Sequence, residues 1–384
     1  MRDEIRIGLV GAGFIGRSHG LAVGAVSGVF PDCPRAIPAV LADVDAAKAE
    51  TAARSLGFER ASADWRDAVD GADAVIVAVP SIHHAEIARY AIAAGKPVLC
   101  EKPVGLSADE AASLAAAAKA ADVVNAVGYT YLRAPLVRHV RALVDAGRLG
   151  KIVHFYGRHF EDYLASPSAP FSWRLDRSLA GRCGALGDLG CHILSIARYL
   201  CGPVEAVSGT STIVHPRRPT SDGALRTVEN EDHAAALLRF AGGVPGVVEV
   251  SRVAIGRKMD LAFELTCERG SIRFDAERMN ELQVYLDEPA MGGAPGFRRV
   301  LISPDHPDYA GFLPAPGHGL GFNDLKTIEL AAFLRGVAGR RSVYPDLGEA
   351  SRIGRLCEAI LDSSDTGRWI HSPEQEPARK GPSE

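Results

Sequence analysis

The chain has 384 residues, which at about 150 residues per domain predicts two or three structural units rather than one small module. Apolar residues make up 47% and charged residues 23%, proportions that exclude a wholly disordered or fibrous chain. Lysine and arginine number 43 against 47 acidic residues, a net charge of −4 with no long basic run, so neither nucleic acid nor an anionic membrane is an expected partner.

Residues 1–128 alternate short apolar runs with alanine-rich runs, a pattern typical of βαβ units around a parallel sheet. Because the apolar runs show little alternation, they predict strands that are buried on both faces. The expected strands are 5–10, 39–42, 74–79, 97–100 and 123–127. The expected helices are 14–25, 46–56, 83–94 and 108–120, the last with a capping box of Ser107 and Glu110.

Residues 129–371 are predicted to form a second domain. It begins with a helix at 136–146, a strand at 152–159 and a helix at 188–200, and helices 323–337 and 347–361 close it. Between them come β-rich runs with no helix between most of them, which predicts an antiparallel sheet with one helix-covered face. These runs are 204–212, 234–240, 246–253, 261–267, 271–274 and 282–285. Residues 372–384 are polar and charged and are expected to be a disordered tail.

Cysteine usage and the N-terminus favour a cytoplasmic protein. The seven cysteines include no C-x-x-C pair, and a chain of this length needs no disulfides, so we expect reduced thiols. The first residues lack the apolar core and cleavage site of a secretory signal. The most apolar stretch, 72–80, is far shorter than the roughly 18 residues that cross a bilayer.

A glycine-rich motif, G-A-G-F-I-G, follows the first expected strand and opens the first helix. In this context the first glycine allows a tight turn, the second lets the backbone approach a pyrophosphate, and the third lets helix and strand pack closely. The predicted ligand is a dinucleotide, and the alternative is a βα turn that binds nothing. The expected cofactor contacts are Gly11, Gly13, Phe14, Ile15 and Gly16.

Asp43 ends the second expected strand, where an acidic residue binds the ribose hydroxyls of NAD, so NADP is the less favoured cofactor. Asp32 matches the usual spacing of about 20 residues better, but it lies between Pro31 and Pro34. We therefore interpret 29–37 as an insertion in a loop. The alternative for Asp43 is that it only caps the next helix.

Two further groups bring acid–base residues. Lys102 follows a later strand in Glu101-Lys102-Pro103, at the sheet edge where ligands bind. Asp188 and His192 are four residues apart, so within the first turn of a helix they share one face and bring a carboxylate and an imidazole together. The alternatives are a solvated lysine, a capping aspartate and a buried structural histidine.

Together these motifs resemble the glucose–fructose oxidoreductase, inositol dehydrogenase and rhizopine catabolism family, Gfo/Idh/MocA, over nearly the whole chain. The matching features are residues 11–16, Pro80 with His84, residues 101–103, residues 128–131, and Asp188 with His192. The resemblance implies an N-terminal Rossmann domain and a C-terminal α/β domain with a large, predominantly antiparallel open sheet. It also implies NAD(P)-linked oxidation of carbohydrates, with Lys102, Asp188 and His192 as the catalytic group. Relatives further suggest a cis Lys102–Pro103 peptide.

The resemblance also suggests where substrate and cofactor lie. Segments 157–163, 172–176 and 317–321 are similar to a branch that acts on sugars and anhydrosugars. Aromatic rings stack on the C–H faces of sugars, and polar side-chain ends select particular hydroxyls by hydrogen bonding. The expected substrate contacts are Lys102, Tyr131, His159, Tyr163, Asp188, His192 and His318. The expected cofactor contacts include Pro80, His84, Glu101, Lys102, Trp173 and Arg174, and the last two are also candidates for the sugar pocket. Ser195 stands where many relatives carry a second acidic residue, so the substrate pattern of inositol dehydrogenases is not assumed.

The expected function is NAD-dependent oxidation of a hydroxyl on a sugar, polyol or anhydrosugar, by hydride transfer to nicotinamide. His192 is the expected general acid/base, Asp188 is expected to orient it or to stabilise its imidazolium form, and Lys102 is expected to stabilise the alkoxide. No metal site is expected, because the cysteines and histidines lack ligand spacing. The alternatives are an NAD-dependent glycoside hydrolase and a non-catalytic nucleotide-sensing regulator. A broad open sheet makes a homodimer or homotetramer the expected assembly.

Overall fold

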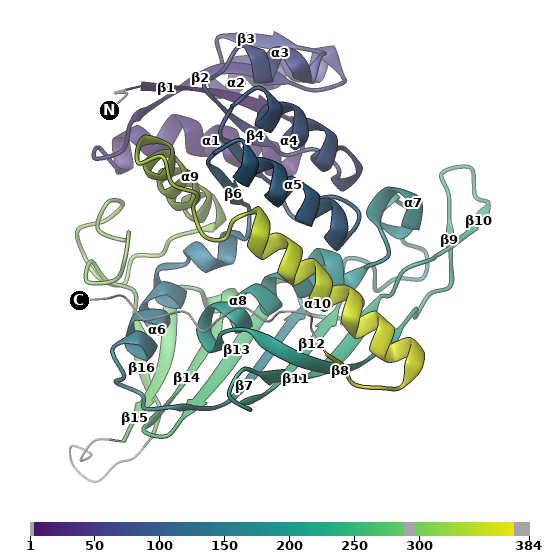
Figure 1. The fold of residues 1–384 in the computed structure, drawn as a ribbon, viewed down its shortest axis with the longest axis vertical. Helices are drawn as coiled ribbons and strands as arrows, with labels where there is room; N and C mark the ends of the chain where they lie inside the picture. The colour runs from purple at the N-terminus through teal and green to yellow at the C-terminus, as the bar shows by residue number, and fades with distance from the viewer. Residues whose placement is uncertain (1–3, 288–295, 372–384) are drawn as a thin grey trace.

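The computed structural model of the chain describes residues 4–287 and 296–371. Its two main sheets are a smaller one formed by the N-terminal part and a larger one that lies below it in Figure 1. None of the described helices combines the length and the apolar character that crossing a bilayer requires. The expected tail, 372–384, lies outside the described residues.

The N-terminal sheet has six parallel strands in the order β3-β2-β1-β4-β5-β6. The order reverses between β1 and β4, and such a reversal opens a crevice at the carboxyl ends of the strands. The strands are β1 (Glu4–Val10), β2 (Arg35–Ala42), β3 (Arg60–Ser62), β4 (Ala74–Val77), β5 (Val98–Cys100) and β6 (Asn125–Val127). The helices are α1 (Phe14–Val29), α2 (Ala46–Leu56), α3 (Trp65–Asp70), α4 (His84–Ala93) and α5 (Ala108–Ala120).

The predicted insertion at 29–37 is wrong. Helix α1 continues to Val29 and β2 begins at Arg35, so only a short turn remains between them. The prolines made the start of this strand look like a loop in the sequence. Pro38 lacks an N–H donor, but it lies where the β1–β2 register shifts, and the sheet tolerates a missing donor there. Asp32 lies in the turn and accepts from Nε of Arg335 at 2.9 Å.

The larger sheet has nine strands in the order β16-β15-β14-β13-β7-β12-β11-β8-β17. Of its described pairings, β7 with β12 is parallel and the others are antiparallel. The strands are β7 (Ile152–Phe160), β8 (Val204–Thr212), β11 (His233–Phe240), β12 (Pro245–Ser251), β13 (Asp260–Cys267), β14 (Gly270–Asp275), β15 (Glu281–Leu286), β16 (Arg298–Leu301) and β17 (Ile370–His371). A separate hairpin of β9 (Arg217–Pro219) and β10 (Leu225–Thr227) projects from the body (Figure 1).

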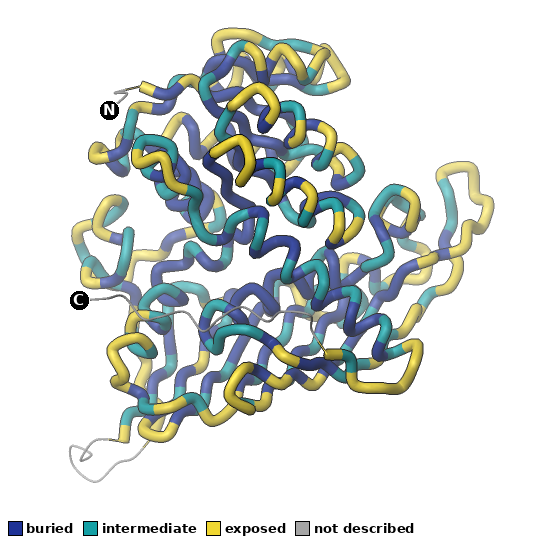
Figure 2. The backbone as a smooth tube through the Cα atoms, viewed as in Figure 1, coloured by how far each residue is buried: buried dark blue, intermediate teal, exposed yellow. Residues whose placement is uncertain are grey.

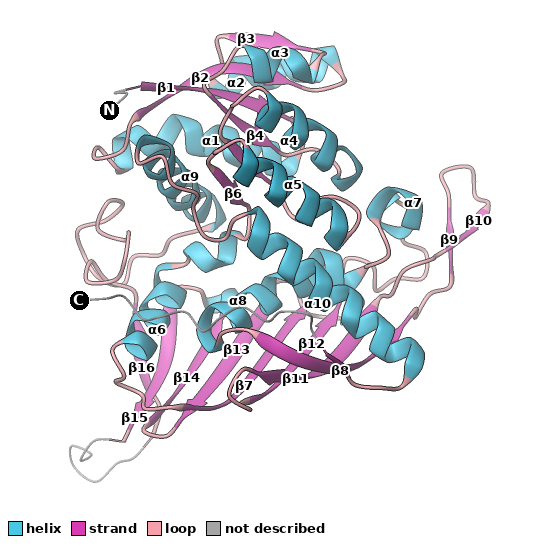
Figure 3. Ribbon diagram, in the orientation of Figure 1, coloured by secondary structure: helices cyan, strands magenta, loops and turns pink. Residues whose placement is uncertain are grey.

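The C-terminal helices join the two sheets. Helix α9 (Phe322–Ala338) packs on α1, whereas α10 (Leu347–Thr366) packs on both α5 and β8. Figure 3 shows helices gathered between the larger sheet and the N-terminal part, and Figure 2 shows that the strands of the N-terminal sheet are mostly buried. The remaining helices are α6 (Pro135–Asp145), α7 (Arg177–Ala180) and α8 (Cys191–Cys201).

The predicted helix 188–200 has a different start. Residues Leu186–Gly190 form a π-helical turn, and the regular helix α8 begins only at Cys191. A π-helical turn is wider than an α-helical turn and is often found at functional sites. The four-residue spacing of Asp188 and His192 therefore does not stack their side chains as it would in an α-helix.

Candidate active site

The turn after β1 has the geometry of a phosphate-binding loop. Gly11 has a φ of +104°, and a Cβ atom on Gly16 would lie 1.9 Å from the Gly11 carbonyl oxygen, so both positions require glycine. Gly13 is the N-cap of α1, and a Cβ atom there would meet nothing within 4 Å. No described side chain caps this helix, so its first N–H groups are open to an anion.

Asp43 closes this loop from the end of β2. Its Oδ2 accepts from the N–H of Ala12 at 2.8 Å and from Nζ of Lys48 at 3.0 Å. Burial opposes ionisation, but these donors hold the pKa of the Asp43 carboxyl below its usual value. The cap of α2 is instead Asp45, whose side chain accepts from the N–H of Lys48. Asp43 is therefore an ionised group beside the loop rather than a helix cap.

A cavity of about 1240 Å³ runs from the loop to the second domain. It brings together almost all of the predicted site residues. Those that line it are Gly11, Gly13, Phe14, Ile15, Asp43, Pro80, His84, Glu101, Lys102, Tyr131, His159, Tyr163, Trp173, Arg174, Asp188 and His192.

Two predicted contacts are not among the residues that line the cavity. Gly16 packs against Gly11 instead, which is the helix-packing role expected of a third glycine. His318 is exposed, and its carbonyl accepts from the hydroxyl of Tyr309 at 2.8 Å. The structure therefore does not bring His318 to the cavity that the other predicted substrate residues line, and its contact with substrate stays a prediction.

His84 links the ends of two strands at the cavity. Its ring nitrogens lie 2.7 Å from the carbonyl oxygens of Pro103 and Val79, so it ties β5 to β4. Burial lowers the pKa of this histidine. The Lys102–Pro103 peptide is cis, as predicted.

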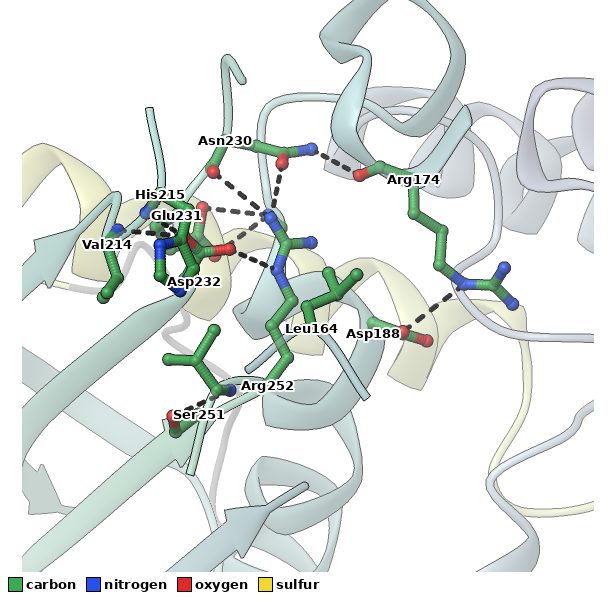
Figure 4. Close-up of polar contacts among 12 residues, drawn as sticks. Leu164, Arg174, Asp188, Val214, His215, Asn230, Glu231, Asp232, Ser251 and Arg252 are labelled. Atoms are coloured by element: carbon green, nitrogen blue, oxygen red, sulfur yellow. Dashed lines mark hydrogen bonds and ion pairs between the residues drawn. The ribbon is translucent and has the colours of Figure 1, made fainter. Parts of the chain in front are cut away.

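Lys102 and Asp188 form the centre of the cavity wall. Nζ of Lys102 donates to Oδ1 of Asp188 at 3.0 Å and to its carbonyl oxygen at 2.7 Å. The Tyr163 hydroxyl donates to Oδ2 of Asp188 at 2.8 Å. Nε of Arg174 lies 3.6 Å from the same oxygen, as Figure 4 shows. Burial opposes both charges, but the pair holds the pKa of Lys102 above its usual value and that of Asp188 well below. Both groups are therefore charged at neutral pH.

His192 is buried beside this pair. Burial lowers the pKa of its imidazole well below the usual value, and the charge of Lys102 and the neighbouring His159 lower it further. Its ring packs edge-on against Tyr131, with centroids 4.8 Å apart. The imidazole is therefore neutral at pH 7 and can accept a proton.

The expectation that Asp188 orients His192 is wrong for this structure. Among the described residues no hydrogen bond joins the two, because the carboxylate oxygens of Asp188 bind Lys102 and Tyr163. Asp188 thus holds the lysine, and the sequence spacing suggested the wrong partner.

The remaining walls come from two segments. His159 lies on β7, with Nδ1 3.0 Å from the carbonyl of Leu189. Trp173 and Arg174 begin a short 3₁₀ turn, and the Arg174 guanidinium lies 4.5 Å above the Trp173 ring. Ser195, in contrast, is 1% exposed and donates to the carbonyl of His192 at 2.7 Å. It therefore faces its own helix and does not replace the acidic residue of relatives.

A buried charge cluster supports the strand that carries Lys102. Glu101 binds Nζ of Lys326 and lies 2.8 Å from Nε2 of His19, and Lys326 donates to Glu329 at 2.8 Å. The histidine and both carboxylates place potential ligand atoms within 4.8 Å of one another, but the Lys326 ammonium already binds both carboxylates. Burial opposes ionisation of Glu101, yet Lys326 and His19 hold its pKa well below the usual value.

Sequence reasoning missed the part of the site that α9 contributes. Lys326 and Phe322 both line the cavity, and the Phe322 ring stacks on Phe14 of the glycine-rich loop, with centroids 6.0 Å apart. The only signal was a lysine among the apolar positions of a predicted helix, because Lys326 is more than 220 residues from Glu101 along the chain. Such a signal becomes meaningful only when the fold is known.

Comparisons with known proteins agree with this site. Residues 5–129 match the model of an oxidoreductase family with an NAD-binding Rossmann fold, and residues 137–273 match the GFO/IDH/MocA C-terminal domain. A levoglucosan dehydrogenase of Pseudarthrobacter phenanthrenivorans is 36% identical over 97% of this chain and 99% of its own length. The scyllo-inositol 2-dehydrogenase (NAD(+)) of Bacillus subtilis is 29% identical over 66% of this chain and 69% of its own.

Solved structures extend the likeness to the whole fold. Levoglucosan dehydrogenase in complex with NADH and levoglucosan superposes with a TM-score of 0.93 at 35% identity, covering 96% of this chain and 99% of that one. An inositol dehydrogenase homolog of Azotobacter vinelandii with NAD+ superposes with a TM-score of 0.80 at 25% identity, covering 96% and 97%. The expected fold, NAD cofactor and oxidoreductase activity are confirmed. The chain belongs to the GFO/IDH/MocA family of NAD-binding oxidoreductases.

Proposed function

We propose that this chain oxidises a secondary hydroxyl of a pyranose-like sugar with NAD, and that levoglucosan is the first substrate to test. The observation that carries the proposal is the meeting of Lys102 and Asp188 at 3.0 Å, on one cavity wall that also contains His192. Lys102 follows the N-terminal sheet and Asp188 belongs to the second domain. Groups that act on one hydroxyl must converge in this way.

The residues present fit a dinucleotide. The N–H groups at the start of α1 would hold the pyrophosphate, and the Asp43 carboxylate would accept from the adenosine ribose hydroxyls. A 2′-phosphate would meet the same carboxylate, which favours NAD over NADP. When bound, NAD supplies the acceptor for a hydride.

The pKa shifts of Lys102 and His192 support different roles for the two residues in proton transfer. Lys102 keeps its ammonium, so it cannot act as the base but stabilises negative charge on the substrate oxygen as the alkoxide forms. His192 stays neutral and accepts the hydroxyl proton. Asp188 fixes the position of the ammonium. The general base and the alkoxide stabiliser are thus different residues.

The sugar would lie against the second-domain wall. Tyr131, Tyr163 and Trp173 offer ring faces for its C–H groups, while His159 and Arg174 offer polar atoms for its hydroxyls. Levoglucosan, an anhydrosugar, is the first substrate to test because the levoglucosan dehydrogenase relative aligns with nearly the whole chain.

We also propose a homodimer or homotetramer in the cytoplasm. The helices lie on one side of the larger sheet, and Leu237 on β11 is 51% exposed (Figure 3). A second copy would cover such a broad surface. All seven cysteines are free thiols, which suits a reducing compartment.

The test is a panel of levoglucosan, other sugars and inositols with NAD, read at the NADH absorbance band. We expect NADH to accumulate with at least one sugar and more slowly with NADP. Aryl glycosides with a catalytic amount of NAD form a second arm. Phenol release without NADH accumulation would favour the glycoside hydrolase, and NAD binding without any turnover would favour the regulator.

A further inference from the structure

Three consecutive polar residues, Asn230, Glu231 and Asp232, are buried beside the site without lining its cavity. Their exposed fractions are 2%, 4% and 0%. They lie between β10 and β11, and Figure 4 shows the Asn230 amide next to the backbone of Arg174. Because buried polar groups cost free energy unless they are bonded, their partners show what this segment supports.

Both ends of the Asn230 amide are bonded. Its Nδ2 donates to the carbonyl oxygen of Arg174 at 2.9 Å, and its Oδ1 accepts from Nη2 of Arg252 at 2.8 Å. The Arg252 side chain is 1% exposed, and its Nε donates to Asp232 at 3.0 Å. Asp232 also accepts from the N–H of Val214 at 2.8 Å. The asparagine that holds Arg174 is therefore fixed by a buried ion pair.

Glu231 holds the other side of the site. Both of its carboxylate oxygens lie 2.9 Å from the N–H of Gly184, and one accepts from the N–H of Leu186 at 2.8 Å. These donors begin the π-helical turn that carries Asp188. A Cβ atom on Gly184 would lie 2.4 Å from the carbonyl oxygen of Glu231, so the two segments are in close contact. Adjacent residues thus anchor the segments of Arg174 and Asp188.

The two anchored side chains form an ion pair rather than a hydrogen bond. Nε of Arg174 lies 3.6 Å from Oδ2 of Asp188, beyond hydrogen-bond distance. A carboxylate oxygen has two lone pairs, and the one that binds Tyr163 keeps the other. One sugar hydroxyl beside the pair would donate to this lone pair and accept from another N–H group of the guanidinium.

We propose that Asn230 and Glu231 are positioning residues that hold the Arg174–Asp188 ion pair where one sugar hydroxyl contacts both side chains. The inference rests on the proposed sugar substrate, because it assigns this ion pair to a substrate hydroxyl. Asn230 sets the position of the guanidinium and Glu231 sets that of the carboxylate. Neither residue touches the substrate.

The primary test is Asn230→Asp. Aspartate keeps the oxygen that accepts from Arg252 but replaces the donor that holds the Arg174 carbonyl. We expect kcat/KM for the best sugar to fall about tenfold, mainly through a higher sugar KM, with NAD affinity within about twofold. If the aspartate variant does not fold, Asn230→Ala replaces it. This variant removes both bonds, and we expect the same rise in sugar KM with NAD affinity retained.

The matched control is Asn125→Asp. Asn125 is also buried, but it does not line the cavity. Its amide nitrogen donates to the carbonyl oxygen of Val123, and its amide oxygen accepts from the N–H of Leu347. We expect it to lower the melting temperature without raising the sugar KM. A purely structural role for Asn230 predicts the same kinetics for both variants, and equal kinetics would overturn the proposal.

The proposal also requires coupling to Arg174. In an Arg174→Ala background, Asn230→Asp should change sugar KM by less than about twofold, because the side chain it positions is gone. Full additivity would contradict the proposal. Glu231→Gln should instead lower kcat more than it raises sugar KM, since Asp188 also holds Lys102. If Asn230→Asp and Glu231→Gln changed kcat and sugar KM in the same proportion, the assignment of Asn230 to Arg174 and of Glu231 to Asp188 would be contradicted.

Failure of the proposed function can be distinguished from failure of the anchoring by Asn230 and Glu231. If the wild-type chain turns over no sugar, the sugar assignment fails, while the anchoring can still be read by hydrogen exchange. Asn230→Asp should then speed exchange in residues 171–176, and Glu231→Gln should speed it in residues 184–190. Unchanged exchange in both segments would reject the anchoring itself.

Discussion

The two ends of the cavity are built in different ways. The nucleotide end, formed by Gly11, Gly13, Phe14 and Asp43, comes from β1, α1 and the end of β2. The proposed sugar end, formed by Lys102, Tyr163, Trp173, Arg174, Asp188 and His192, comes from separate segments between residues 102 and 192. The nucleotide end uses backbone N–H groups and one carboxylate, whereas the sugar end depends on charged side chains that buried residues hold in place.

This difference shows what determines the precision of each end. A loop between consecutive elements takes its shape from local backbone preferences, so glycine positions suffice to define it. Side chains from distant segments meet only if buried supports fix each segment, as Glu231 does for Asp188. Changes at the sugar end should therefore affect chemistry and sugar binding while the nucleotide end stays intact.

The largest expected effect is on chemistry at the sugar end. His192→Ala should lower kcat by roughly 10²–10⁴, because the group that accepts the hydroxyl proton is removed. NAD affinity, measured by quenching of protein fluorescence, should change little. An NAD affinity that falls in parallel with kcat would show that the two ends are not independent.

Lys102→Ala sharpens the same comparison. It should also lower kcat, and adding it to His192→Ala should cost less than the two single effects combined, because both groups act on one proton transfer. Steady-state kinetics of the two single variants and the double variant measure this coupling. Fully additive losses would mean that His192 acts elsewhere than on the hydroxyl held by Lys102.

The next largest effect concerns the Glu101 cluster, formed by Glu101, Lys326, Glu329 and His19. Lys326→Met should reduce the free energy of unfolding by about 3–5 kcal/mol, because two buried carboxylates lose their shared cation. Urea unfolding followed by circular dichroism measures it. Lys119→Met, on the exposed face of α5, is the matched control and should stay within about 0.5 kcal/mol. Similar losses in both variants would mean that the ammonium contributes nothing specific.

The sequence predicted the nucleotide end well and the sugar end only in part. The glycine motif and Asp43 lie next to strands whose apolar character is plain, so their geometry followed from local rules. The partner of Asp188 was predicted wrongly, because a π-helical turn leaves no periodic signal in one sequence. Lys326 and Asn230 were missed because their partners lie far along the chain or belong to the backbone.

A smaller effect is expected at the nucleotide end. Asp43→Ala should weaken NAD binding about tenfold and narrow the gap to NADP, because it removes the ribose acceptor and frees Lys48 for a 2′-phosphate. The ratio of kcat/KM for NAD to that for NADP measures it. Asp45→Ala is the control, since it removes the α2 cap and should leave the ratio unchanged. If the ratio changes only in the Asp45 variant, the ribose acceptor has been misassigned.

The smallest expected effect is a shift in pH dependence. His192 must be neutral to accept a proton, and burial, Lys102 and His159 lower its pKa well below 6.5. At saturating NAD, kcat/KM for the sugar should therefore stay level as the pH falls through 6.5 and decline only at lower pH. His159→Gln removes one of the groups that disfavour the imidazolium, so the decline should begin at higher pH than in the wild type, by a fraction of a unit. The control is His306→Gln, which alters a histidine paired with His139 outside the cavity and should leave the profile unchanged. A wild-type decline centred at or above pH 6.5 would mean that another group accepts the proton.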